Sequence, residues 1–146
     1  MALLEIVKYP DPFLEKVSKP VGEFNERLHV FLDDMAETMD YAGGMGLAAV
    51  QVGRLMRVCL VMTDDGLVEL VNPEIIFKNR TKKGAEACLS VPNESYKLRR
   101  HHHISVRAQD RHGNAFERDF HGIEAVCVQH EMDHMDGKLI NNPLDI

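Results

Sequence analysis

Residues 129–134 read Gln129-His130-Glu131-Met132-Asp133-His134 and contain the pattern H-E-x-x-H. On a helix, two histidines four residues apart lie on the same face, so both rings can bind one metal ion. A glutamate directly after the first histidine lies beside that ion, where it can move a proton to or from a bound water. The pattern therefore predicts a metal-dependent hydrolase.

A helix that begins at Gly122 and ends near Gly137 is expected to carry both histidines. Three apolar residues continue the same helical stripe toward its N-terminus: Ile123, Val126 and Cys127. His130 and His134 therefore point toward the core, where an unligated ring would need another polar partner.

A catalytic site of the zinc type needs a third protein ligand and an open position for water. Downstream, the third histidine position of the metzincin pattern is Ile140, Asp136 lies on the wrong helix face, and Asp145 is nearly terminal. The best upstream candidate is Cys88, which lies among turn-forming and extended residues and is followed by Pro92. A thiolate is a strong soft ligand. The alternative is an inert buried thiol, the usual state of a lone cysteine.

A glycine-rich segment reads Gly44-Met45-Gly46-Leu47-Ala48-Ala49-Val50-Gln51. Its glycines and small residues let a backbone approach a ligand closely, and Gln51 offers an amide N–H to a developing oxyanion. Taken alone, such a loop more often marks a turn, and no lysine follows to suggest a phosphate cradle.

Other polar residues have two interpretations each. Glu86 either orients a metal ligand or is a solvated carboxylate, and we weigh these equally. The three histidines at 101–103 resemble a metal cluster, but neighbours on a strand face opposite ways, which favours ordinary surface histidines. Cys59 and Cys127 lie inside apolar runs and are predicted to be inert thiols.

Length and composition, with 45% hydrophobic and 27% charged residues, indicate one domain over residues 1–146, which the H-E-x-x-H pattern predicts to be catalytic. The net charge of −6 argues against nucleic acid as a partner, and the adjacent Arg99 and Arg100 are predicted to be solvated. The first residues have no positive n-region and no apolar h-region, so no signal peptide is expected, and no apolar run approaches membrane-spanning length. Three cysteines without disulfide spacing favour a cytoplasmic location.

Periodicity predicts the remaining elements. Apolar residues at helical spacing indicate a long amphipathic helix over residues 25–41, and Asp11 with Pro12 is expected to cap a short helix. Strands are expected over residues 57–62, 70–77, 104–109 and 115–120, with a turn at 110–114. We therefore predict an α+β fold, in which an antiparallel or mixed sheet packs around the C-terminal metal-binding helix and the longer helix lies outside.

Three motifs in this order resemble the peptide deformylase family: G-x-G-L-A-A-x-Q at 44–51, E-x-C-L-S at 86–90 and Q-H-E-x-D-H at 129–134. Two flanking stretches add to the resemblance: Tyr9-Pro10-Asp11-Pro12 and Val71-Asn72-Pro73-Glu74. The resemblance covers essentially the whole chain. It implies a peptide-deformylase-like α+β fold, in a short form without a C-terminal extension.

The resemblance implies an enzyme of protein biosynthesis and N-terminal methionine processing. Its reaction would remove the formyl group from the N-terminal formylmethionine of nascent polypeptides and release formate. N-formylmethionyl peptides would be its partners, with no direct nucleic acid or membrane contact, and the chain is expected to be a monomer. Two alternatives stay open: a related metal-dependent amide hydrolase or peptidase, and a non-catalytic metal-stabilised binding module.

Site roles follow from the same resemblance. Three residues would hold one divalent metal ion: Cys88, His130 and His134. The ion is expected to be Fe²⁺ natively, and Zn²⁺, Ni²⁺ or Co²⁺ can substitute. Glu131 would be the general base and then the general acid, while Gln51 and the backbone N–H of Leu89 would stabilise the oxyanion.

The resemblance also implies how the substrate lies. Met45, Gly46 and Ala87 would contact the peptide backbone in the manner of an added strand. The methionine side chain would lie against a wall formed by Ile123, Val126, Cys127 and His130. The family's second motif usually reads E-G-C-L-S, so the methyl group of Ala87 puts catalytic efficiency, but not metal binding, in question.

Overall fold

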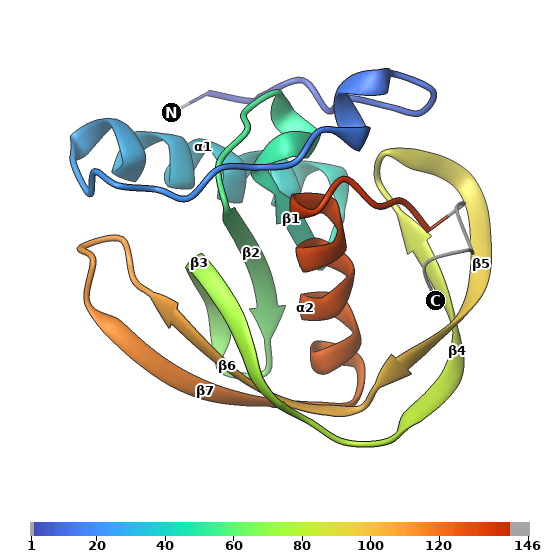
Figure 1. The fold of residues 1–146 in the computed structure, drawn as a ribbon. Helices are drawn as coiled ribbons and strands as arrows, with labels where there is room; N and C mark the ends of the chain where they lie inside the picture. Colours follow the sequence, from blue (N-terminus) through green and yellow to red (C-terminus); the bar gives the residue numbers. More distant parts are fainter. Residues whose placement is uncertain (1, 141–146) are drawn as a thin grey trace.

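The helix that carries the H-E-x-x-H pattern lies at the centre of the molecule. The computed structural model describes residues 2–140. Helix α2, Gly122–Met135, is surrounded by strands on several sides in Figure 1. Helix α1, Glu26–Ala42, lies outside the sheet, as the sequence predicted.

Seven strands in the described residues form two antiparallel sheets. The larger has the order β1-β2-β3-β6-β7 and comprises Gly46–Ala48, Val58–Thr63, Gly66–Lys78, His103–Gln109 and Ala115–His121. The smaller pairs only β4, Thr81–Cys88, with β5, Val91–His101. Because β4 follows β3 and β5 precedes β6, the two-stranded ribbon continues from the larger sheet and curves around α2 (Figure 1).

Strand β2 explains why its sequence is a continuous apolar run. Cys59 and Val61 face a core cluster that includes residues of α2, whereas Val58 and Leu60 face a second cluster that includes α1. A strand buried on both faces shows no alternation of polar and apolar residues. The larger sheet is thus the middle layer between the two helices.

The helix ends follow from local chemistry. Asn25 caps α1 by accepting a hydrogen bond from the Leu28 backbone, and Gly43 ends it in the left-handed conformation at φ 73°. Asp11 caps a short 3₁₀ helix, η1, Pro12–Glu15. At the end of α2, Asp136 is the capping residue, and Gly137 follows it with φ 77°, which places the predicted glycine one residue beyond the cap.

Some elements were missed or misplaced. β3 begins at Gly66, several residues before the predicted start, and β4 with β5 had not been predicted as a strand pair. The three histidines at 101–103 do not share one strand, because β5 ends at His101 and β6 begins at His103. Within residues 2–140, none of the helices has both the length and the apolar character that a membrane crossing requires.

Candidate active site

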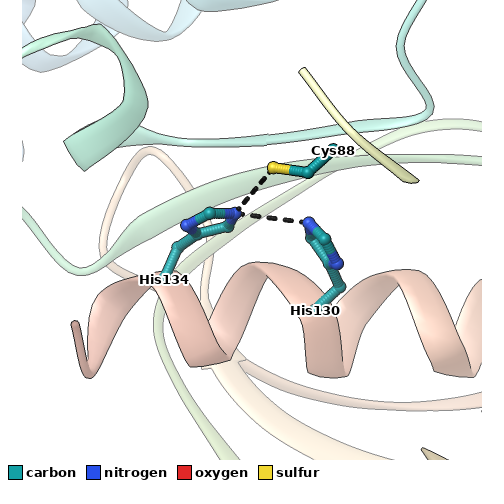
Figure 2. A group of neighbouring side chains, drawn as sticks. All are labelled: Cys88, His130 and His134. Carbon is teal, nitrogen blue, oxygen red and sulfur yellow. Dashed lines mark hydrogen bonds between the residues drawn. The ribbon is translucent and has the colours of Figure 1, made fainter. Parts of the chain in front are cut away.

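Helix α2 and strand β4 bring three metal-binding atoms together. His130 and His134 lie one turn apart on the inward face of α2, and Cys88 is the last residue of β4 (Figure 2). Cys88 Sγ lies 3.3 Å from His134 Nε2, which lies 3.2 Å from His130 Nε2. All three side chains are buried. The predicted sulfur therefore does face the two rings.

The spacing of these atoms fits a metal ion. Around one tetrahedral ion, with metal–nitrogen bonds of about 2.0–2.1 Å and metal–sulfur bonds of about 2.3 Å, ligand atoms lie about 3.4–3.6 Å apart. The three observed ligand atoms all lie within 4.8 Å of one another. Thiolate and imidazole donors suit zinc, iron, nickel and cobalt rather than magnesium or calcium. The donor set and geometry thus support a metal cofactor held by this chain.

Glu86 orients one of the rings. Its carboxylate, on β4, accepts a hydrogen bond from His130 Nδ1 at 3.0 Å and two from Arg100, at 2.8 and 3.1 Å. A proton held on Nδ1 leaves the lone pair of Nε2 directed at the metal position. Burial alone would raise the pKa of Glu86, but the hydrogen bonds from His130 and Arg100 lower it. Glu86 is therefore an orienting carboxylate, and the solvated alternative is wrong.

The site favours positive charge at one ring and neutrality at the other. Burial opposes protonation of His130, but hydrogen bonds to Cys88 and Glu86, with the nearby charge of Glu131, raise its pKa to about 10. Burial, with the charge of His130, lowers the pKa of His134 well below its usual value. The same acidic surroundings would stabilise a metal ion that replaces the second proton of His130 at Nε2, and His134 stays in the neutral form that binds metals.

Glu131 has the properties of a proton-transfer group. It is 3% exposed, and its Oε1 has no hydrogen-bond partner among the described residues. Burial raises the pKa of Glu131 to about 7. A carboxyl group with a pKa near neutrality can both accept and return a proton at cellular pH.

Gln51 is held in place beside the cysteine. It lies in a short 3₁₀ helix, η2, Ala49–Val52, and its Oε1 accepts a hydrogen bond from the Ala48 backbone at 2.9 Å. Its Nε2 donates to Ser90 Oγ at 3.2 Å and to Cys88 Sγ at 3.6 Å. The side-chain amide of Gln51 therefore lies beside Cys88, with one donation directed at its sulfur. Leu89 follows Cys88 in the turn between β4 and β5.

An apolar pocket of about 520 Å³ opens onto this cluster. Its volume lies in the range of small-molecule and peptide side-chain sites. Six of the seven residues predicted to contact substrate line it: Met45, Gly46, Ala87, Ile123, Val126 and Cys127. Gln51, Leu89, Cys88, His130 and Glu131 line it as well. The structure thus brings every predicted site residue to one place, with His134 buried beside Cys88 and His130.

Arg100 is a site residue that the sequence analysis missed. It is 7% exposed, and besides Glu86 it donates a hydrogen bond to Asp133 of α2. The prediction that it is solvated is therefore wrong. The sequence feature that indicates its burial is its spacing from Leu98, since residues two apart on a strand share a face and Leu98 is buried.

A sequence model described as "Polypeptide deformylase" matches residues 3–145. The chain belongs to this family. A peptide deformylase from Alkalilimnicola ehrlichii is 44% identical over 95% of this chain and 80% of the relative. One from Heliobacterium modesticaldum is 45% identical over 95% of this chain and 92% of the relative.

Solved peptide deformylases share the fold. The enzyme from Legionella pneumophila has a TM-score of 0.94 at 39% identity and covers 97% of this chain and 86% of that one. The enzyme from Ehrlichia chaffeensis, solved in complex with actinonin, has a TM-score of 0.95 at 34% identity and covers 99% and 90%. The predicted α+β, peptide-deformylase-like fold is confirmed.

Proposed function

We propose that this chain is the metal-dependent hydrolase that removes the formyl group from the N-terminal formylmethionine of nascent polypeptides. The observation that supports this proposal most strongly is that Cys88, His130 and His134 converge beside the buried Glu131, at an apolar pocket. Its membership in the polypeptide deformylase family supports the same activity. Residues 1–146 would act as one catalytic domain.

Cys88, His130 and His134 would hold one divalent ion, Fe²⁺ in the cell, with Zn²⁺, Ni²⁺ or Co²⁺ as substitutes. When bound there, such an ion supplies a Lewis acid that polarises a carbonyl oxygen and lowers the pKa of a bound water. Glu86 keeps the His130 ring in the tautomer that the ion requires.

Glu131 would carry the proton. As a carboxylate it takes a proton from the attacking water, and as a carboxylic acid it gives that proton to the departing nitrogen. The water oxygen bonds to the formyl carbon and the bond between that carbon and the nitrogen breaks, so the products are formate and a free amino terminus. Gln51 Nε2 and the Leu89 backbone N–H would donate hydrogen bonds to the oxygen on which negative charge develops.

The sheet edges provide a place for the peptide. β1 is the outer strand of the larger sheet, and β4 is paired only with β5, so each leaves one edge free of strand partners in the described fold. Met45, Gly46 and Ala87, at these edges, line the pocket. A peptide could hydrogen-bond to them as an added strand. The methionine side chain would then lie against Ile123, Val126 and Cys127.

The competing functions differ in their products. We expect formate release from formyl-Met-Ala-Ser and little acetate release from acetyl-Met-Ala-Ser. Equal or faster turnover of the acetyl peptide would favour the related amide hydrolase, and no turnover of either would favour the binding module. The control is Glu131→Gln, which should abolish turnover while metal content and melting temperature stay unchanged.

The native metal can be assigned by elemental analysis of protein purified without oxygen, which we expect to contain iron. Activity of the iron form should then decay in air, because the metal or the Cys88 thiolate oxidises, and the zinc form should stay active. Air-stable activity of the iron form would contradict the assignment. We further propose that the enzyme is a cytoplasmic monomer and that it has no nucleic-acid or membrane partners.

A further inference from the structure

A second cluster of metal-binding side chains lies on the face of the larger sheet turned away from α2. His103 begins β6 and stands directly opposite His121, the last residue of β7. Asp119 precedes His121 by two residues and therefore points to the same side. Ile104 and Phe120, which alternate with these residues, belong to the core that contains α2. The cluster is therefore separated from the active-site pocket by the sheet.

The three side chains are close enough to share one ion. One nitrogen of each histidine and one carboxylate oxygen of Asp119 lie within 4.8 Å of one another. The rings of His103 and His121 stack with their centroids 4.1 Å apart at an interplanar angle of 21°. Asp119 and His121 are exposed, so small rotations of their side chains can bring the ligand atoms to bonding positions while solvent delivers the ion.

One ring nitrogen of His103 at this cluster has no hydrogen-bond partner among the described residues. Phe77 of β3 contacts its ring, with the centroids 5.0 Å apart, while His121 stacks on it. His103 Nε2 is shielded from solvent and has no hydrogen-bond partner among the described residues. A buried ring nitrogen without a partner costs free energy, and binding of an ion through it would remove that cost.

We propose that His103, Asp119 and His121 form a second metal site, which binds one borderline divalent transition-metal ion such as Zn²⁺ or Cu²⁺. Two imidazoles and one carboxylate match these ions, whereas calcium and magnesium prefer oxygen ligands alone. The Asp119 carboxylate offsets part of the ionic charge, and Ser105 donates a hydrogen bond to its Oδ1. Water would complete the coordination at this exposed site.

The test is a Zn²⁺ titration of the whole protein, with binding followed by calorimetry and by metal content after desalting. We expect two bound ions per wild-type chain and one in His121→Ala. Asp119→Asn should weaken the second ion at least about tenfold. Both residues are exposed, so their replacement should leave the fold intact, as checked by the melting temperature of the metal-loaded protein.

Two controls separate this site from its surroundings. His112→Ala removes a ring from another histidine pair, 5.0 Å from the ring of His29, and should still bind two ions. Cys88→Ser should lose the active-site ion but keep the second, so the two metal assignments can fail independently. One ion per wild-type chain that is retained in His121→Ala and lost in Cys88→Ser, or two ions in His121→Ala, would overturn the proposal.

Discussion

Gly46 lies where the active site has no room for a side chain. A Cβ atom at this position would lie 2.7 Å from Glu131 Oε2 and 2.7 Å from Cys127 Sγ. Gly46→Ala should therefore displace the Glu131 carboxylate and lower kcat/KM by about a hundredfold, because small misplacements of a catalytic group are costly. Steady-state kinetics on the formyl peptide, at saturating metal, measures the effect.

Two variants test that explanation. Gly46→Ala combined with Cys127→Ala removes one of the two clashes and should recover part of the lost activity. Gly84→Ala, on β4, is the matched control, since nothing lies within 4 Å of the position that its new methyl group would take. Activity of Gly46→Ala equal to that of the wild type would show that Glu131 tolerates the shift.

At this scale the sequence identified the reacting residues but not all of their supports. Spacing alone places His130 and His134 on one helix face, whereas the glycine-rich segment is only weak evidence for the role of Gln51 until the resemblance is added. The buried state of Arg100 depends on Glu86, fourteen positions away, and on Asp133 of another element. Such pairing is set by the tertiary fold, so an arginine beside another arginine gave no reliable sign of it.

The buried carboxylate of Glu86 makes one of the contacts between the β4–β5 ribbon and α2. Glu86→Gln removes the negative charge that His130 and Arg100 both contact, and should weaken metal binding about 10- to 100-fold. Competition with a chelator measures the affinity, and excess metal should restore activity. Glu94→Gln, which changes an exposed glutamate of the same ribbon, should bind metal as the wild type does. Unchanged affinity in Glu86→Gln would contradict the orienting role.

Elements whose apolar residues recur at regular spacing were predicted correctly, whereas the β4–β5 ribbon was not predicted. The stripe that predicted α1 contains Leu28, Leu32 and Met35, all of which are buried. In β4, by contrast, only Glu86 and Cys88 are buried and neither belongs to an apolar alternation. Its strand character comes from pairing with β5 and from contact with α2, which a local pattern does not contain.

Within the whole molecule, the β4–β5 ribbon should lose the most stability when the metal is removed. A two-stranded hairpin is only marginally stable alone, and β4–β5 pairs with no other strand in the described fold. Its attachment to α2 includes Cys88, Glu86 and Arg100. Chelation should therefore speed amide hydrogen exchange in β4–β5 far more than in β2–β3.

Exchange followed by mass spectrometry, with and without chelator, tests this expectation. Addition of Zn²⁺ after chelation should restore the slow exchange of the ribbon. An equal increase over the whole sheet would instead indicate that the ion stabilises the molecule globally. In that case the ribbon and the larger sheet would open as one cooperative unit.

The position of α2 also constrains how the protein is made. All seven described strands precede it in sequence, yet Ala125, Val128 and Met135 fill the concave side of the sheet. While the chain has emerged from the ribosome only as far as β7, the apolar strand residues that α2 will cover are exposed to water. Folding therefore awaits the synthesis of α2, and until then the incomplete polypeptide is exposed to aggregation.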